Sequence, residues 1–167
     1  MTDRAEVRVL PPIVLAAALA LQALVALLFP MRFIPNAAAI AAGAAIIAES
    51  VVLMLLAVME IKRAGTAFDS RKPTTAIVAT GVYRFTRNPV YFSMMLLVVG
   101  VGLMLNSPLA LLLAIPTGSA LCLTAIRPEE RYLEGKFDRE YRAYRDAVPR
   151  WLSPRRLAMA VLDHSVR

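Results

Sequence analysis

Apolar residues along this chain fall into four long runs separated by polar segments. The runs cover residues 13–29, 37–61, 90–105 and 109–126, and each is almost free of charged side chains. A helix of about 20 apolar residues crosses the hydrocarbon core of a bilayer. The pattern therefore predicts a single all-α integral membrane domain with about four transmembrane helices.

Two polar segments, residues 62–88 and 127–167, follow the second and fourth runs. The first contains six Lys or Arg residues against one acid, which by the positive-inside rule places it in the cytoplasm. With four spans, both the N and C termini are expected on that same side. The loop and the tail can then meet on the cytoplasmic face and form one site.

A stripe of apolar and aromatic residues marks the beginning of the tail. Its members recur at spacings of four, four, three and four, which indicates one face of an amphipathic helix: Leu133, Phe137, Tyr141, Tyr144 and Val148. We expect this helix to close the site, although a basic aromatic helix ordinarily lies on a membrane surface. Just beyond it, Arg150, Trp151, Arg155 and Arg156 are typical of an anchor at headgroup depth.

Composition supports the membrane assignment and limits the chemistry. The chain is 59% hydrophobic, with a mean hydropathy of +0.61. Its net charge of +7 is therefore attributed to the cytoplasmic face and anionic headgroups, and not to nucleic-acid binding. The single cysteine, Cys122, excludes an intramolecular disulfide, and the single histidine, His164, lies in the last residues, so we expect no metal site. The sequence leaves the oligomeric state open.

Glu49 lies near the middle of the second run, where an ionisable side chain needs a partner or a water-filled cavity. It can be a substrate or proton site, or a neutral carboxyl that hydrogen bonds across a helix pair. The Ala- and Gly-rich half before it suits close approach to a neighbouring helix. If Glu49 is functional, the alternative to an enzyme is a small four-helix transporter or channel subunit.

The segment 81–91 is basic and directly precedes the third run. Asn88 is a suitable N-cap and Pro89 a suitable first helical residue, so a helix is predicted to begin here. Its free N–H groups and the positive end of its dipole would point toward Tyr83 and Arg87. The segment can thus hold an anion, or it can simply be a basic loop that caps a membrane helix.

Three motifs in fixed order carry a resemblance to known enzymes. They are Thr80-Gly81-Val82-Tyr83, then Arg87-Asn88-Pro89-Val90-Tyr91, then Glu129-Glu130-Arg131-Tyr132-Leu133 with the aromatic stripe and Val148-Pro149-Arg150 after it. Over roughly residues 65–151 the chain resembles the isoprenylcysteine carboxyl methyltransferase and phospholipid methyltransferase family of integral membrane methyltransferases. The order of the motifs around two apolar spans makes a chance match improbable.

The resemblance implies S-adenosylmethionine as the methyl donor, bound between the loop before the third span and the start of the tail helix. The donor-binding positions it implies are Thr75, Ala76, Ile77, Val78, Tyr83, Asn88, Pro89, Val90, Tyr91 and Glu129, and the catalytic positions are Arg87 and Glu130. The family's eukaryotic members usually have His at Asn88 and Gly at Ser93. They also have a substrate-associated Arg near Ala125, for which Arg127 is a possible substitute, and this difference weakens the case for a prenylcysteine carboxylate acceptor.

The residue types also suit the chemistry of this donor. It carries a carboxylate, an ammonium, a ribose and a cationic sulfur, so its site needs a place for an anion, an acid and an aromatic surface. Asn88 with the helix start supplies the anion site, and Glu129 supplies the acid. Tyr83 or Tyr91 supplies the aromatic surface. Methyl transfer is a direct displacement that needs alignment and exclusion of water but no metal. The acceptor is expected to be a lipid-like molecule: an isoprenylcysteine carboxylate, a phospholipid amine or another hydrophobic compound. An amine or thiol would need a base, for which Glu49 or Glu130 is nearest.

Overall fold

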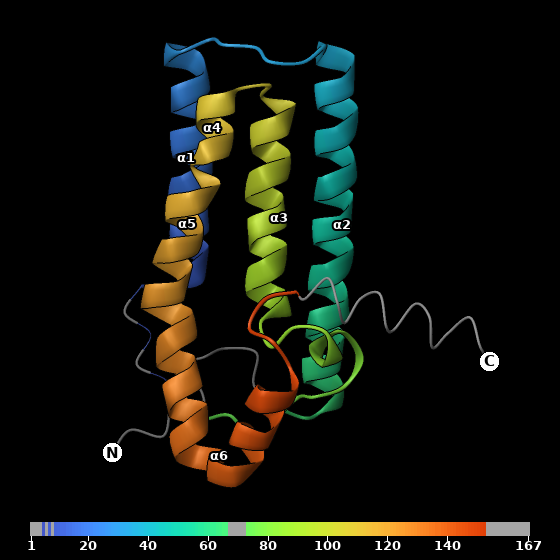
Figure 1. Ribbon diagram of the computed structural model, residues 1–167, viewed down its shortest axis with the longest axis vertical. Coiled ribbons are helices and arrows are strands. Elements are labelled where there is room, and N and C mark those ends of the chain that lie inside the picture. The colour runs from blue at the N-terminus through green and yellow to red at the C-terminus, as the bar shows by residue number, and fades with distance from the viewer. Residues whose placement is uncertain (1–4, 6, 8, 67–72, 153–167) are drawn as a thin grey trace, which may run out of the picture.

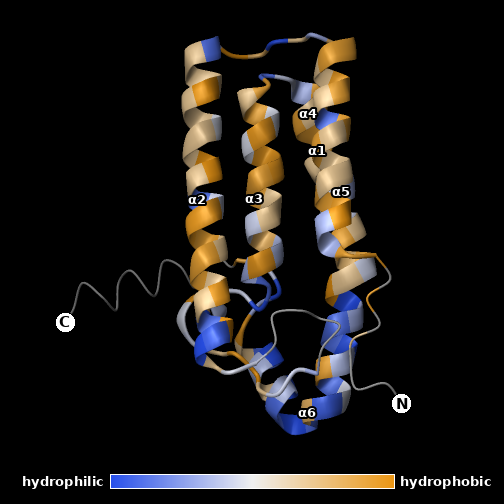
Figure 2. Ribbon diagram, turned by 180° about the vertical axis from the view of Figure 1, so that it is seen from behind, coloured by the Kyte–Doolittle hydropathy of each residue, from blue (hydrophilic) through white to orange (hydrophobic). Residues whose placement is uncertain are grey.

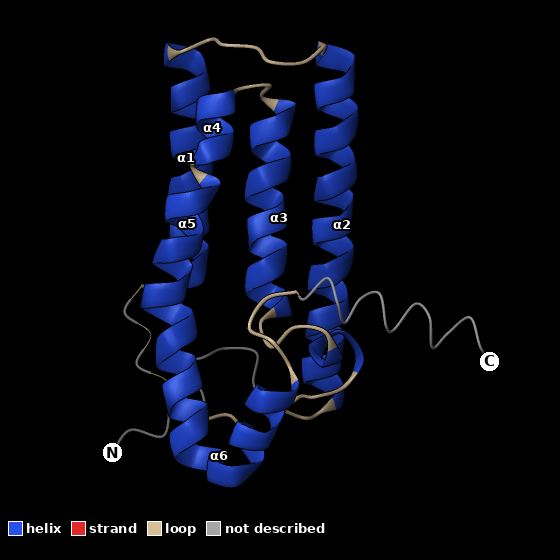
Figure 3. Ribbon diagram, viewed as in Figure 1, coloured by secondary structure: helices blue, strands red, loops and turns tan. Residues whose placement is uncertain are grey.

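The apolar runs form helices that stand side by side in the computed structural model, which describes residues 5, 7, 9–66 and 73–152 (Figure 1). The first three are α1 (Pro11–Leu28), α2 (Asn36–Arg63) and α3 (Pro89–Met104). The fourth run forms α4 (Pro108–Leu112), α5 (Ala114–Leu121) and a π-helical segment, Cys122–Ile126, which continues into α6 (Arg127–Ala147). A short 3₁₀ helix, η1, covers Gly81–Arg84, and the described residues contain no strand (Figure 3).

The membrane character of the fold follows from these helices. α1, α2 and the helical run that begins at Pro108 are long and apolar enough to cross a membrane, and α3 is a shorter apolar helix. Figure 2 shows apolar residues along all of them and hydrophilic residues gathered at the end that carries α6. The predicted all-α membrane fold is confirmed. His164 lies outside the described residues.

The fourth apolar run is not the single helix that was predicted for residues 109–126. It is divided at Leu113, between α4 and α5. Pro116 explains the break, because it has no N–H to bond the carbonyl of Leu112 and its ring crowds that carbonyl. At the other end, the Ser107 hydroxyl caps α4 by accepting a hydrogen bond from the Ala110 amide at 3.3 Å.

Close packing of α2 on α3 depends on glycine. A Cβ atom at Gly43 would lie 2.6 Å from the Gly100 carbonyl oxygen and 2.7 Å from the Met104 amide nitrogen, so no larger residue fits without movement of backbone. About two turns further along α2, the Ser50 hydroxyl donates a hydrogen bond to the Ser93 carbonyl on α3 at 2.7 Å. The expected close approach of the Ala- and Gly-rich half is therefore found at Gly43, whereas most of the alanines around it face outward.

A buried glutamine joins α1 to the rest of the bundle. The Gln22 side chain is fully buried, and its amide nitrogen donates to the carbonyl oxygens of Val98 and Ala110, both at 2.9 Å. In a membrane, hydrogen bonds of this kind hold helices together where lipid offers no hydrophobic driving force. One side chain thus connects α1, α3 and α4.

The predicted amphipathic tail helix is present as α6, but it is bent back on itself, which the aromatic stripe did not indicate. Asp138 has a positive φ of 41° inside α6, which divides it into two arms. Its ψ of −107° lies outside the left-handed helical region, so the chain leaves the helix at this residue. Gly135, three residues earlier, is a weak helix former. Figure 1 shows the second arm turning back toward α2 and α3. Tyr141 and Tyr144 are thereby brought to the polar end of the bundle.

Candidate functional site

A cavity of about 390 Å³ lies at the polar end of the bundle. Its walls come from the beginnings of α1 and α3, the end of α2, the loop before α3 and both arms of α6. The lining residues are Leu10, Pro11, Pro12, Ile61, Thr66, Thr74, Ala76, Ile77, Val78, Tyr83, Arg87, Asn88, Pro89, Val90, Tyr91, Met94, Glu129, Glu130, Leu133, Tyr141 and Tyr144.

The structure brings nearly all of the sequence-predicted site residues to this one cavity. Every predicted donor-binding residue except Thr75 lines it, as do Arg87 and Glu130. Thr75 is exposed, and its hydroxyl donates to the Gly65 carbonyl at 3.2 Å, away from the lining. The loop and the tail, which the topology was expected to place on one side, therefore do meet around a common space.

Glu129 and Tyr91 form a hydrogen-bonded pair in the cavity wall. The Tyr91 hydroxyl donates to Glu129 Oε2 at 2.8 Å, which links the third helix to the first turn of α6. Burial raises the pKa of the Glu129 carboxyl above its ordinary value; the bond from Tyr91 lowers it and the charge of Glu130 raises it further. The π-helical segment directly before α6 sets the rotation of this turn, and such segments often occur at functional sites.

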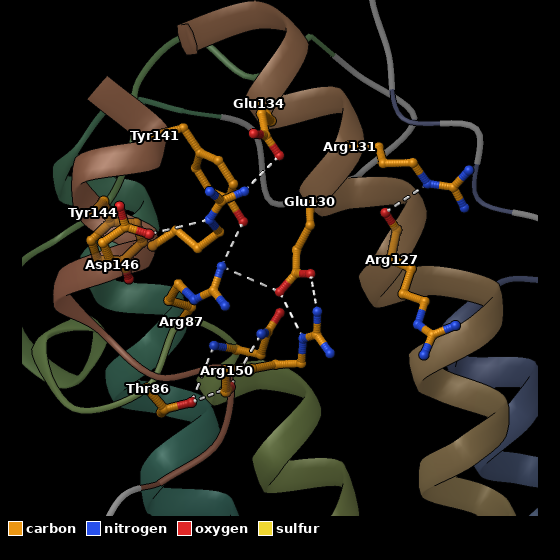
Figure 4. A network of polar contacts seen from close by, with 12 residues as sticks. Thr86, Arg87, Arg127, Glu130, Arg131, Glu134, Tyr141, Tyr144, Asp146 and Arg150 are labelled. Atoms are coloured by element: carbon orange, nitrogen blue, oxygen red, sulfur yellow. Dashed lines mark hydrogen bonds and ion pairs between the residues drawn. The ribbon is translucent and has the colours of Figure 1, made fainter. Parts of the chain in front are cut away.

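Glu130, the next residue, has different partners. Arg150 donates two hydrogen bonds to its carboxylate, from Nε to Oε1 at 2.9 Å and from Nη2 to Oε2 at 2.6 Å (Figure 4). Arg87 Nη1 lies 3.4 Å from the same Oε1. A bidentate contact between arginine and a carboxylate, as Arg150 makes with Glu130, is among the stronger ion pairs in proteins. The side chains of Arg87 and Glu130 are only 8% and 14% exposed, so these charges interact in a largely enclosed space.

Arg87 also binds the second arm of α6. Its Nη1 donates to the Tyr141 hydroxyl oxygen at 3.2 Å, whereas its buried Nε has no hydrogen-bond partner among the described residues. The pKa of Tyr141 is raised to about 12, first by burial and then by the nearby charge of Glu130. Tyr144, on the same arm, donates from its hydroxyl to the Tyr83 carbonyl at 2.8 Å and so holds η1 against α6.

The segment 148–151, which follows α6, is fastened to the loop before α3. The Pro149 carbonyl accepts a bond from the Arg87 amide at 3.0 Å. The Arg150 carbonyl accepts from the Thr86 hydroxyl at 2.9 Å and from the Asn88 side-chain amide at 3.2 Å. These bonds position Arg87 and Asn88 directly, and they place the Arg150 guanidinium beside Glu130.

The structure corrects one prediction about these residues and adds to another. Asn88 occupies the N-cap position of α3, but its side chain makes no capping hydrogen bond; its amide nitrogen donates to the Arg150 carbonyl instead. Arg150, expected in a headgroup anchor, is paired with Glu130, and the neighbouring Trp151 packs against Phe92, with ring centroids 6.5 Å apart. Arg155 and Arg156 of that expected anchor lie outside the described residues.

Sequence reasoning missed the contribution of Arg150, Thr86, Tyr141 and Tyr144 to the site. The motif Val148-Pro149-Arg150 was visible, but no site role could be given to it, because its return to the cavity depends on the bend at Asp138. The aromatic spacing identified both tyrosines as one helix face, without indicating what they contact.

Glu49 is not part of this site. It lies on the exposed outer surface of α2, does not line the cavity and forms no hydrogen bond to a described residue. Its expected bond across a helix pair is not present within the described part of the chain. The geometry therefore gives no support to a transporter that depends on Glu49, nor to Glu49 as a base in the cavity.

Comparison with known proteins identifies a family model that covers much of the chain. A family model described as phospholipid methyltransferase matches residues 38–140. The range includes nearly all of α2, the loop of residues 73–88 before α3 (the cavity loop), α3 and the first arm of α6. No curated protein and no solved structure matches the chain.

Proposed function

Because this match covers more than half of its length, the chain belongs to the phospholipid methyltransferase family, and we propose that it transfers a methyl group from S-adenosylmethionine to a lipid-like acceptor. Methyl transfer follows from the family. The identity of the donor and the nature of the acceptor are our proposal. The observation that supports it best is the convergence of the cavity loop, Tyr91 and the Glu129–Glu130 pair on one cavity at the polar end of a membrane bundle.

The donor would lie against the cavity loop and the start of α3. Backbone N–H groups at the beginning of that helix suit the donor carboxylate, and Glu129 suits its ammonium or ribose hydroxyls. The aromatic faces of Tyr83 and Tyr91 suit the sulfonium. Ala76, Ile77, Val78, Asn88, Pro89 and Val90 complete this proposed donor surface, and Thr75 would support it from outside the cavity.

Arg87 and Glu130 would act at the acceptor. Methyl transfer requires the nucleophile, the methyl carbon and the sulfur to lie in line, so the main work of the protein is alignment and exclusion of water. An amine acceptor must lose a proton before it attacks, and Glu130 is the lining carboxylate proposed to receive it. A carboxylate acceptor would need no base.

The position of the cavity suits an acceptor that arrives from the bilayer. Leu10, Pro11 and Met94 give the cavity an apolar side where α1 and α3 begin, which fits an acyl or prenyl chain. The polar end carries Lys62, Arg63 and Arg84, and we propose that it faces the cytoplasm with both termini. The donor would then enter from the cytosol and the acceptor from between the helices.

A methyl-transfer assay, which follows labelled methyl groups from the donor into lipid, tests the proposal. Detergent-purified protein is incubated with methyl-labelled S-adenosylmethionine and total lipid from the expressing cells, and the organic phase is counted. We expect label in the lipid fraction with the wild-type protein and with Glu134→Gln, which changes an acid of α6 outside the cavity lining. Glu129→Gln should abolish it. Equal labelling by Glu129→Gln would contradict the proposed donor site.

A further inference from the structure

Glu49 is an ionisable side chain in the middle of a membrane-spanning helix, and it faces away from the rest of the bundle. The other charged residues of α2 lie at its polar end: Glu60, Lys62 and Arg63. At 1.5 Å per residue, Glu49 lies about 16 Å along the helix from Glu60, which is near the middle of a hydrocarbon core about 30 Å thick. The residue is exposed, and it forms no hydrogen bond or ion pair with a described residue.

A carboxyl group at that depth needs a hydrogen-bonding partner. The hydrocarbon core holds no water, and an unpaired polar group there costs free energy even when it carries no charge. Ser50, the next residue, meets the same need on the inner side of α2, where its hydroxyl donates to the Ser93 carbonyl at 2.7 Å. No group in the described part of the chain does this for Glu49, which leaves another molecule in the membrane to supply the partner.

Glu49 belongs to a seam of exposed residues along α2. Their spacings are four, three, four, three and four, and the seam consists of Ala38, Ala42, Ala45, Glu49, Val52 and Leu56. Two helices that pack side by side with knobs in holes show this repeat of seven. The first half of the seam is alanine, and small residues let two helices approach closely in a bilayer. The seam therefore has the spacing and the size of a helix-packing surface.

The opposite side of α2 is already occupied. Its buried residues form a separate stripe: Ala39, Gly43, Ser50, Ala57 and Ile61. α3 and η1 pack against this side, and α2 stands at the edge of the bundle (Figure 1). Ile61 lines the cavity, whereas no seam residue does. A molecule that covers the seam therefore leaves the cavity unobstructed.

A second copy of this chain matches the seam through symmetry. Two copies with the same orientation in a membrane are related by a two-fold axis along the membrane normal, which sets their α2 helices parallel. In a parallel pair each seam residue meets its own counterpart at the same depth. Glu49 then meets the partner subunit's Glu49. A protonated carboxyl has both an O–H donor and an acceptor oxygen, so two such groups satisfy each other.

We propose that the protein forms a parallel homodimer through the α2 seam, with the two Glu49 carboxyls hydrogen bonded to each other at the two-fold axis. This pair fixes the register of the two helices, as a single polar residue at a heptad position does in coiled coils. Another register would set each carboxyl against apolar side chains. Each copy keeps a complete cavity, and the inference does not depend on the identity of the methyl donor or acceptor.

Disulfide cross-linking in the membranes of the expressing cells maps the interface. In a Cys122→Ala background, single cysteines replace Ala45 or Val52 on the seam, or Val51 away from it; all three positions are exposed. We expect oxidation to give covalent dimers with Ala45→Cys and Val52→Cys, and few with Val51→Cys. Three equal yields, no dimer at either seam position, or cross-links from the seam to a different protein would overturn the proposal.

Energy transfer between two differently labelled pools of the purified protein, mixed in liposomes, measures the monomer–dimer equilibrium. Glu49→Leu should raise the dissociation constant about tenfold or more, the size expected of one or two hydrogen bonds between helices. Glu49→Gln should dimerise nearly as well as wild type, because two amides can also hydrogen bond to each other. Absence of transfer in the wild type at every protein-to-lipid ratio, or an unchanged constant in Glu49→Leu, would overturn the proposal.

A second pair of variants tests the seam without altering Glu49. Ala45→Leu places a larger side chain between the two helices and should weaken the dimer, whereas Ala44→Leu, exposed but away from the seam, should behave as wild type. This pair also replaces Glu49→Leu if that variant does not fold. Equal dissociation constants for Ala45→Leu and Ala44→Leu would show that the copies meet on another face, contrary to the proposal.

Discussion

Glu129 and Glu130 are adjacent in sequence, yet their surroundings give them different properties. Glu129 is enclosed and bonded to a neutral tyrosine, so burial raises its pKa. Glu130 is held by two guanidinium groups. Two carboxylates in one cavity can therefore have separate roles, with Glu129 toward the donor and Glu130 toward the acceptor.

The raised pKa of Glu129 makes donor binding depend on pH. Because the pKa in the folded protein lies above the ordinary value of 4.5, the folded state holds the proton more tightly than the unfolded state, and stability from this group falls as pH rises above 4.5. A bound ammonium reverses the preference by favouring the carboxylate. Affinity for S-adenosylhomocysteine should therefore rise with pH above 4.5 and level off once Glu129 is ionised.

Calorimetric titrations across that range measure this effect. The control is Glu129→Gln, which cannot titrate and should show weak binding with little dependence on pH. A wild-type affinity that is flat or falls as pH rises from about 5 to about 8 would contradict the role given to Glu129.

At the scale of elements, the site depends on two helices that are not regular. The π-helical segment Cys122–Ile126 fixes the rotation of the first turn of α6, and the bend at Asp138 returns Tyr141 to the cavity. Among the remaining helices, Gly43 on α2 lies so close to the backbone of α3 that a larger residue there has no room.

Substitution of Gly43 tests how far the site depends on that contact. Gly43→Ala would push a methyl group against the Gly100 carbonyl, so we expect a loss of stability of about 1–3 kcal/mol. Thermal melting in detergent measures it. Ala44→Val, on the exposed face of the same helix, is the matched control and should melt near wild type. Equal melting temperatures for the two variants would show that α2 and α3 do not pack as described.

The sequence predicted best those features that depend on a single helix or a single motif. Apolar runs are visible without tertiary structure, and the bounds of α1, α2 and α3 were predicted closely because polar residues and prolines end each run. Most residues expected around the cavity were identified because their motifs lie on either side of α3. Pro116 should have signalled the break between α4 and α5.

Other features depend on tertiary contacts and left no local pattern. The bend at Asp138 interrupts a regular stripe of aromatic residues, so periodicity alone favoured one straight helix. Arg150 reaches Glu130 only because of that bend, and the bond from the Asn88 side-chain amide to the Arg150 carbonyl depends on the same return of the chain. Glu49 was expected to face a partner, and its outward position could not be seen before α2 was placed against α3.

At the scale of the whole molecule, the described parts of the two polar segments, residues 73–88 and 127–152, lie at one end of the bundle and the two short connections lie at the other (Figure 1). Asn106 ties those short connections together, since its side-chain amide donates to the Ile34 carbonyl at 2.7 Å and to Asn36 Oδ1 at 2.8 Å. This arrangement gives the protein a polar face, which carries the cavity, and an opposite face formed by the two short connections, here called the closed face.

Labelling can show which face meets the cytoplasm. In a Cys122→Ala background, single cysteines replace Phe33, at the closed face, or Arg84, at the polar face, both of which are exposed. In intact cells or right-side-out vesicles, we expect a membrane-impermeant maleimide to label Phe33→Cys and to label Arg84→Cys only after the membrane is opened. The reverse pattern would contradict the proposed orientation.

The most direct test of the account is calorimetric binding of S-adenosylhomocysteine to the detergent-purified protein. We predict saturable binding by wild type, a loss of about tenfold or more in Glu129→Gln, and wild-type affinity in Glu134→Gln. A folded wild-type protein that does not bind, or a Glu129→Gln variant that binds equally well, would contradict a donor site in this cavity.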